Sequence, residues 1–350
     1  MPSKRPTQAS TQRLMTWCGA GAAVLGIVGI FGPTAFVVEG PGPAVNTLGE
    51  YHDAKILEIS GHKTYPTQSR LDLTTVSVAG GPGREIRGFE AFGAWLSPQE
   101  DLQPKEFVYP AGTTSEESDS QNAVAMTDSQ QVAAAAALTE LGIDYKIQTV
   151  VAGTVEEKGS LFKTGDVLKK VNGTTISALD QAPAAVKAST GDTIPVVVTR
   201  GGKDVTLKAP VNNVEGQRSL GLYIQGTYDF PFQVKFGLKD IGGPSAGGML
   251  ALGIYDKLTE GSLAGDRHVA GTGTITADGK VGAIGGIAQK VVGAKLEGAS
   301  VFLAPAANCA ELKGRVPQGL DVYSVATLKE GVATLTALGK GDQPTAARCG

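Results

Sequence analysis

The sequence predicts an α+β protein with a single transmembrane helix, a β-rich middle domain and an α/β C-terminal domain. Three observations support this prediction. Residues 14–38 form an uncharged apolar segment, residues 145–212 hold short β-branched runs between Gly-rich turns, and strand-like and helix-like segments alternate from residue 213 onward. The 48 glycines among the 350 residues fit a chain with many tight turns.

Charge and composition exclude several classes of partner. The 31 basic and 34 acidic residues nearly balance, so nothing indicates a nucleic-acid partner. Three cysteines and three histidines form no cluster of the kind that binds a metal. The sequence contains no G-x-x-x-x-G-K-[ST] motif, so we expect no ATP-driven motor in this chain and no cofactor.

The apolar segment is interpreted as a membrane anchor. A bilayer core about 30 Å thick takes about 20 helical residues, so residues 14–38 are long enough to cross it. Lys4, Arg5 and Arg13 precede the segment. The positive-inside rule then places residues 1–13 in the cytoplasm and the rest of the chain outside it, in a single-pass protein of the cell membrane. A cleaved signal peptide is the alternative, and the length of the apolar run argues against it.

The predicted topology places the three cysteines in different compartments. Cys18 falls within the predicted span, whereas Cys309 and Cys349 fall outside the cytoplasm, where disulfides persist. We expect Cys309 and Cys349 to form a disulfide worth about 4 kcal/mol in the chain-entropy description. Two unpaired thiols are the alternative.

The rest of the chain divides by pattern into four parts. Residues 39–124 contain β-branched strands near residues 55–80 and a polar loop at 111–122, and an Ala-rich helix follows at 131–141. We expect the early strands to pack on the C-terminal domain, with the middle domain inserted between them. The predicted parts are a membrane-proximal β region at 39–124, the middle domain at 125–212, the C-terminal domain at 213–340 and a tail at 341–350.

The middle domain resembles a PDZ domain. It has a Gly-Asp turn before a strand that ends in Asn-Gly, then a short helix, then two strands joined by Gly201-Gly202. The resemblance implies that the domain binds an extended peptide as an added strand. A loop that grips the peptide's terminal carboxylate is expected at Leu141, Gly142 and Ile143, which depart from the usual Gly-Leu-Gly-hydrophobic pattern. The alternative is a domain that only spaces or docks other parts.

Ser245 lies in the stretch DIGGPSAGGM, at the start of an apolar helix. Glycines on both sides let a substrate carbonyl approach the backbone closely, and the free amides of a helix start can bind an oxyanion. This pattern suits a nucleophilic serine, with the backbone amides of Gly243 and Ser245 as oxyanion donors. An ordinary serine cap on a Gly-rich helix start is the alternative.

A serine nucleophile needs a base, and Lys290 is the best candidate. The three histidines, His52, His62 and His268, do not follow the serine in an order that suits a hydrolase triad. Lys290 lies at the edge of the apolar stripe of a predicted helix, where burial would lower its pKa. A lysine on an ordinary amphipathic helix is the alternative.

Three motifs in order resemble the Lon-type Ser–Lys protease domain. They are GGPSAG around Ser245, TGTIT from Thr272, and G-G-I-x-x-K ending at Lys290. The order of anchor, PDZ-like module and protease domain is similar to that of bacterial membrane-anchored PDZ–Lon proteases, which lack an ATPase domain. The resemblance implies that Ser245 is the nucleophile, Lys290 the general base and Thr272 the residue that holds Lys290.

Two positions depart from the Lon pattern. Gly242 stands where an aspartate is usual, and Thr274 stands where the T-G-E-[IV]-T glutamate is usual. The resemblance still implies an ATP-independent serine endopeptidase that cleaves unfolded or C-terminally presented polypeptides. It also implies a homo-oligomer, in the form of a hexameric ring. The alternative is an inactive PDZ/Lon-like membrane scaffold that binds peptide segments.

Overall fold

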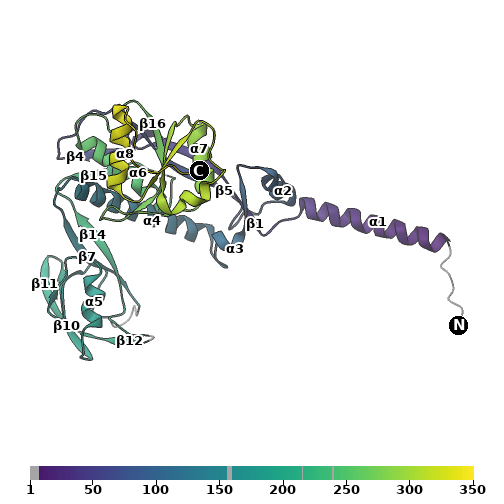
Figure 1. Cartoon of the computed structure of the whole chain (residues 1–350). Helices are drawn as coiled ribbons and strands as arrows, with labels where there is room; N and C mark the ends of the chain where they lie inside the picture. The colour runs from purple at the N-terminus through teal and green to yellow at the C-terminus, as the bar shows by residue number, and fades with distance from the viewer. Residues whose placement is uncertain (1–7, 156–159, 215, 239) are drawn as a thin grey trace. The chain divides into compact units, whose positions relative to one another are not determined.

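The computed structural model of the chain describes residues 8–155, 160–214, 216–238 and 240–350, which fall into two units (Figure 1). Unit 1 comprises residues 1–58, 64–137 and 235–350, and unit 2 comprises residues 59–63 and 138–234. Of the predicted cytoplasmic segment 1–13, residues 1–7 with Lys4 and Arg5 lie outside the described residues. The unit boundaries differ from the predicted middle domain at 125–212, because residues 125–137 belong to unit 1 and the second unit continues to residue 234.

A mixed six-stranded sheet forms the centre of unit 1. Its order is β20-β19-β16-β5-β1-β6, in which the first three pairings are parallel and the last two antiparallel. The early strands β1 and β5 therefore share a sheet with the C-terminal strands. The strands are β1 (Phe36–Asn46), β5 (Arg70–Ala79), β6 (Asp101–Pro104), β16 (His268–Gly271), β19 (Val301–Pro305) and β20 (Asp321–Val325).

Helices cover both faces of this sheet, which explains why β19 is apolar throughout. Side chains alternate along a strand, so Phe302 faces α7 (Ile287–Leu296) while Leu303 faces α8 (Leu328–Lys340). The helix α6 (Gly247–Leu258) packs against α8 and β5. A strand that is buried on both faces has a continuous hydrophobic sequence, and the sequence of β19, VFLAP, is of this kind.

The predicted membrane span at 14–38 is not one helix. α1 covers Gln8–Phe31, and the segment after Pro33 enters β1, where Val37 and Val38 are buried in the sheet unit. The apolar run was thus long only because it joined part of a helix to part of a core strand. In the described part of the chain, no helix combines the length and apolar character needed to cross a bilayer.

This finding corrects three linked expectations. The transmembrane helix at 14–38 is wrong, and so is the fold class that included it. The location as a single-pass protein of the cell membrane, with a cytoplasmic N-terminus and an extracytoplasmic catalytic domain, is wrong for the same reason. The observed fold is a mixed α/β arrangement.

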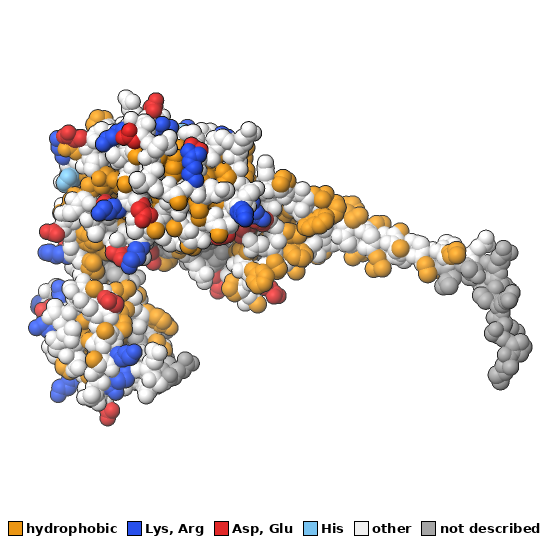
Figure 2. Space-filling model, viewed as in Figure 1, with side chains coloured by type: hydrophobic (Ala, Val, Ile, Leu, Met, Phe, Trp, Pro, Cys, Tyr) orange, Lys and Arg blue, Asp and Glu red, His pale blue; other side chains and the backbone are white. Residues whose placement is uncertain are grey.

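Helices α2 (Gly88–Leu96), α3 (Lys105–Val108) and α4 (Ser115–Glu140) connect β5 to unit 2 along the chain. α2 buries Ala91 and Ala94 and leaves Phe92 and Trp95 exposed, and Figure 2 shows hydrophobic side chains gathered over α1 and α2. α4 begins at Ser115, so the polar stretch 111–122, predicted as a loop, is largely helical. Glu117 accepts from the Thr114 backbone and Thr114 Oγ1 accepts from the Glu117 backbone, so this pair forms a capping box at the helix start.

Unit 2 is a β-sheet of order β11-β10-β8-β7-β14, with β9 paired to β8 and the short helix α5 (Gln181–Lys187). Its core joins Val151, Leu168, Val186 and Val196 with other apolar residues of the unit. The buried carboxylate of Asp166 forms an ion pair with Arg200 at 2.6 Å. The strands are β7 (Lys146–Thr154), β8 (Val167–Val171), β9 (Thr174–Thr175), β10 (Thr193–Arg200), β11 (Lys203–Pro210), β12 (Asn212–Val214), β13 (Gln217–Ser219) and β14 (Leu222–Asp229).

Shorter elements complete the chain. β2 (Glu50–Tyr51) pairs with β3 (Ala54–Lys55), and β17 (Thr274–Ile275) pairs with β18 (Val281–Gly282). The remaining elements are β4 (Leu57–Ser60), β15 (Gln233–Phe236) and the 3₁₀ helices η1 (Pro244–Ala246) and η2 (Ala306–Leu312).

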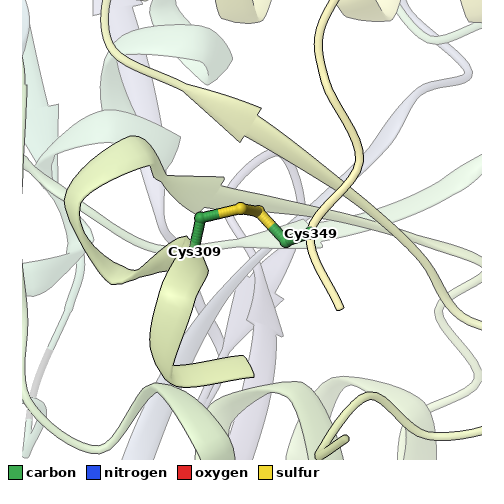
Figure 3. Close-up of a disulfide and its surroundings, with 2 residues drawn as sticks. All are labelled: Cys309 and Cys349. Atoms are coloured by element: carbon green, nitrogen blue, oxygen red, sulfur yellow. A yellow bond between two sulfur atoms is a disulfide. The ribbon is translucent and has the colours of Figure 1, made fainter. Parts of the chain in front are cut away.

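A disulfide joins Cys309 of η2 to Cys349 in the C-terminal tail (Figure 3). Cys349 is buried and packs in the cluster formed by α7, β19 and β20. Its backbone N–H donates to the carbonyl of Val322 in β20. The disulfide and this hydrogen bond together hold residues 341–350 on the sheet unit. Cys18 is exposed and unpaired.

Candidate active site

Ser245 is held in a tight 3₁₀ turn immediately before α6. The turn η1 covers Pro244–Ala246, and Gly243 precedes it with φ 84°, in the left-handed region that favours glycine. Gly247, the first residue of α6, has no room for a side chain, because a Cβ there would lie 2.8 Å from Oγ of Ser129. The glycines around Ser245 thus allow the bend and the close packing that hold the serine at the helix start.

Lys290 is buried in the first turn of α7, with 2 % of its surface exposed. α7 begins after Gly286, whose φ of 67° allows the sharp entry into the helix. Burial of the amine lowers the pKa of Lys290 to about 8, and the charge of Glu39 acts in the opposite direction. A large fraction of the amine is therefore neutral near pH 8.

The structure brings Ser245, Thr272 and Lys290 together at the carboxyl end of β16. Lys290 Nζ lies 2.7 Å from Oγ of Ser245 and 3.1 Å from Oγ1 of Thr272. Thr272 Oγ1 in turn donates to the backbone carbonyl of Ser245 at 3.0 Å. Three segments, the turn before α6, the end of β16 and the start of α7, are thereby joined through one amine and two hydroxyls.

The backbone around the serine is also tied down. The carbonyl of Ser245 accepts a second bond from the N–H of Gly273 at 2.8 Å. Of the two predicted oxyanion donors, the Gly243 N–H donates to the carbonyl of Asn122 at 2.9 Å, so it must leave this bond to hold an oxyanion. The amide of Ser245 lies at the positive end of the α6 dipole and is the better placed of the two.

A cavity of about 290 Å³ opens on Ser245 and Lys290. One wall is the segment Leu73–Ser77 of β5, and Met126 of α4 and Ile241 contribute apolar surface. β16 pairs with β5 only from Arg70 to Leu73. Within the described chain, no strand pairs with this edge of β5 beyond Leu73, so the cavity is bordered by unpaired strand edge.

The three histidines lie in other surroundings. His268 Nε2 is 2.6 Å from Oδ2 of the buried Asp72, and His52 lies 3.9 Å from Asp240 at the surface. His62 packs against Phe232 in unit 2, with the two rings tilted at 45°. Among the described residues, no group of His, Cys, Asp and Glu side chains is suited to bind a metal.

Sequence reasoning missed the polar groups next to Lys290. Gln289 is 2 % exposed, and its side-chain amide donates to Asp101 Oδ2 at 2.7 Å. Glu39 lies in the core strand β1, and its charge acts against the lowering of the Lys290 pKa.

The predicted peptide-gripping residues lie apart from the main cavity of unit 2. Leu141, Gly142 and Ile143 form the turn after α4, where Gly142 has φ 67°. The cavity of unit 2, of about 90 Å³, lies between α5 and the segment 218–224, and is lined by Leu168, Ala182, Val186, Leu220, Leu222 and Ile224 among others.

A serine hydroxyl in contact with a buried amine at a helix start is the arrangement of a Ser–Lys hydrolase. A comparison with known protein families gives a match to the part of the chain that contains this site. Residues 233–336 match the Lon protease (S16) C-terminal proteolytic domain. This part of the chain, which holds Ser245, Thr272 and Lys290, is therefore similar to a proteolytic domain of that type.

Curated Lon proteases are similar to part of the chain. The chain is 39% identical over 105 residues to Lon protease from Roseiflexus castenholzii, covering 29% of this chain and 13% of that protein. It is 40% identical over 94 residues to Lon protease 1 from Sorangium cellulosum, covering 26% and 11%. The chain therefore spans only a small part of the length of these relatives.

One solved structure with a match to part of the chain is a PDZ domain. It is the PDZ domain of the SdrC-like protein from Listeria monocytogenes. The aligned part covers 23% of this chain and 85% of that chain, at 13% identity and a TM-score of 0.19.

Proposed function

We propose that the chain is a serine endopeptidase in which Ser245 is the nucleophile and Lys290 the general base. The observation that carries this proposal is the 2.7 Å separation between Lys290 Nζ and Ser245 Oγ, with the amine buried and its pKa lowered to about 8. A serine hydroxyl needs a base whose pKa is near the working pH, and this amine meets that requirement.

The reaction follows from these positions. The neutral Lys290 amine takes the Ser245 proton as Oγ attacks a peptide carbonyl, and the resulting lysinium protonates the leaving amine. The same amine then deprotonates the water that releases the acyl group. Thr272 holds Nζ through its hydroxyl, and the amide of Ser245 at the α6 start stabilises the oxyanion.

The substrate is proposed to be an extended polypeptide. The unpaired edge of β5 beyond Leu73 borders the cavity at Ser245, so an extended chain can add there as a further strand. A folded protein cannot present its backbone in this way, so unfolded or terminal segments are the expected substrates. Cleavage is proposed to need no ATP. A homo-oligomer in the form of a hexameric ring is proposed from the family resemblance alone.

Unit 2 is proposed to bind peptide segments as a PDZ-like domain. β14 is an edge strand of its sheet, and the apolar cavity lies between β14 and α5. A peptide added beside β14 would place alternate side chains in this cavity. Replacing Leu222 by Lys should weaken peptide binding, measured by fluorescence anisotropy, while cleavage of a short peptide stays unchanged.

The test of the endopeptidase is cleavage of a fluorescein-labelled unfolded polypeptide without added nucleotide. The Ser245→Ala and Lys290→Ala variants should lose cleavage, and Lys295→Ala, on the same helix, should retain it. Equal cleavage by Ser245→Ala would leave the peptide-binding scaffold without protease activity as the better description.

A further inference from the structure

Ser129 is a buried serine on the alanine-rich face of α4. Met126, Ser129, Ala133 and Ala137 follow one another at helical spacing, and all four are buried. A hydroxyl in such surroundings loses its contact with water, so it needs a hydrogen-bond partner in the protein. An alanine at position 129 would avoid this requirement. The partner of Ser129 therefore indicates what its hydroxyl does.

The partner is the carbonyl of Pro244, the residue before the candidate nucleophile. Ser129 Oγ donates to the Pro244 carbonyl oxygen at 3.0 Å. Serine and threonine in a helix commonly donate to a carbonyl of their own helix, as Thr127 Oγ1 does to the carbonyl of Ala123. Ser129 instead bonds to a residue far along the chain. Its hydroxyl joins α4 to the turn η1 that holds Ser245.

The Pro244 carbonyl belongs to the peptide unit that carries the Ser245 N–H. This unit is planar and trans, so its carbonyl and its N–H point in opposite directions. Gly247 N–H also donates to the Pro244 oxygen, so both lone pairs of this oxygen are used. The bond from Gly247 lies within the turn, whereas the bond from Ser129 comes from outside it. Ser129 therefore fixes the direction of the Ser245 N–H relative to α4.

α4 also engages the other predicted oxyanion donor. Gly243 N–H donates to the carbonyl of Asn122 at 2.9 Å, and a Cβ on Gly242 would lie 2.7 Å from Cβ of Asn122. With the Gly243 amide engaged, the Ser245 N–H is the remaining predicted donor. A hydrogen bond weakens steeply when the donor points away from the acceptor, so the direction of this N–H determines how well it stabilises an oxyanion.

On the basis of the Ser–Lys mechanism above, we propose that Ser129 is a positioning residue of the site: its hydroxyl holds the Pro244–Ser245 peptide so that the Ser245 N–H points at the oxyanion of the tetrahedral intermediate. Ser129 acts through this peptide and not by contact with the substrate. It lies outside residues 233–336, the segment that matches the proteolytic domain, so the proposal gives α4 a part in the chemistry of that segment.

The proposal predicts a selective loss of kcat in Ser129→Ala. Without the hydroxyl the Ser245 N–H is less well directed, and kcat should fall about tenfold, less than the loss of about a hundredfold or more that follows removal of such a donor. The oxyanion develops only in the transition state, so KM should stay within about twofold. Steady-state rates on a short fluorogenic peptide measure both. Thr127→Ala removes an exposed hydroxyl from the same helix and, as the matched control, should leave both unchanged.

Two further substitutions separate the hydrogen bond from the packing of the side chain. Ser129→Cys fills a similar volume, but a thiol is a weak donor, so its kcat should be as low as that of Ser129→Ala. Ser129→Thr keeps the hydroxyl and should recover most of the lost kcat. Unchanged kcat in Ser129→Cys would mean that the side chain only fills space, and it would overturn the proposal even if Ser129→Ala fails to fold.

The direction of the Ser245 N–H can be measured without proteolysis, from its residual dipolar coupling in NMR spectra of the partly aligned full chain. The coupling should change in Ser129→Ala and Ser129→Cys and return in Ser129→Thr, while the coupling of Val269 in β16 stays the same. An unchanged Ser245 coupling overturns the proposal, whether or not the chain cleaves a peptide. The predicted change in a chain that cleaves nothing would contradict the endopeptidase and support the role of Ser129 in holding this peptide.

Discussion

Thr272 Oγ1 accepts a hydrogen bond from Lys290 Nζ at 3.1 Å and donates its own proton to the carbonyl of Ser245. One hydroxyl therefore fixes both the amine and the backbone of the serine. Because the hydroxyl is buried, its two bonds restrict Lys290 to one orientation toward Ser245.

We predict that Thr272→Val lowers kcat by about 30-fold, which corresponds to about 2 kcal/mol for a lost buried hydrogen bond at the reacting amine. The shape of the side chain is kept, so the thermal midpoint should change little. Thr272→Ser keeps the hydroxyl and should retain most of the activity. Full activity in Thr272→Val would mean that Lys290 is positioned by other contacts.

We predict that kcat/KM rises with pH through a midpoint near the Lys290 pKa of about 8. The neutral amine is the base, so activity is low where the amine is protonated and increases as it loses its proton. Steady-state rates on a short peptide from about pH 6 to pH 10 measure this limb. A flat profile over this range would exclude Lys290 as the base.

Lys290 should also make the fold less stable at neutral pH. Its folded pKa of about 8 lies below the ordinary lysine pKa of 10.5, so between these values the unfolded chain binds more protons and stability increases with pH. Well below pH 8 the full cost of about 3 kcal/mol applies. Lys290→Met should therefore abolish cleavage and raise the urea midpoint at pH 7, with a smaller gain at pH 10.

Two glycines in helices should respond to alanine in opposite ways. Gly293 of α7 touches β1, where a Cβ would lie 2.5 Å from Gly42 O, whereas a Cβ on Gly93 of α2 would meet nothing within 4 Å. Gly293→Ala should displace α7, lowering both stability and activity. Gly93→Ala should stabilise by about 1 kcal/mol, the usual gain in a helix interior. Differential scanning calorimetry measures both, and a stabilising Gly293→Ala would contradict the packing of α7 on β1.

The disulfide between Cys309 and Cys349 closes a sequence separation of 40 residues. The chain-entropy description gives about 4 kcal/mol for a loop of this length. Denaturant unfolding with and without a reductant should show a loss of this order, and Cys349→Ala should show the same loss without reductant. Cys18→Ser should have no effect, since Cys18 is unpaired.

The residues of the candidate site were easier to predict from the sequence than the points where helices and strands begin and end. Ser245 and Lys290 could be paired because each sits in a short motif whose residues shape its own backbone. The apolar run at 14–38 misled because hydrophobicity alone does not separate an exposed helix from a buried strand, and β1 begins within that run at Phe36. The hydrogen bond from Gln289 to Asp101 could not be predicted, because α7 and β6 lie far apart along the chain. Contacts of this kind depend on the sheet order, which local patterns do not determine.

The most direct test of the account is covalent labelling of Ser245 by a fluorophosphonate, followed by peptide mass spectrometry. The account predicts a single adduct on Ser245 that forms in the unmodified chain and in Lys295→Met, increases in rate as the pH passes about 8, and is lost in Lys290→Met. Labelling of Ser245 at the same rate in Lys290→Met, or an adduct on another residue alone, would contradict it.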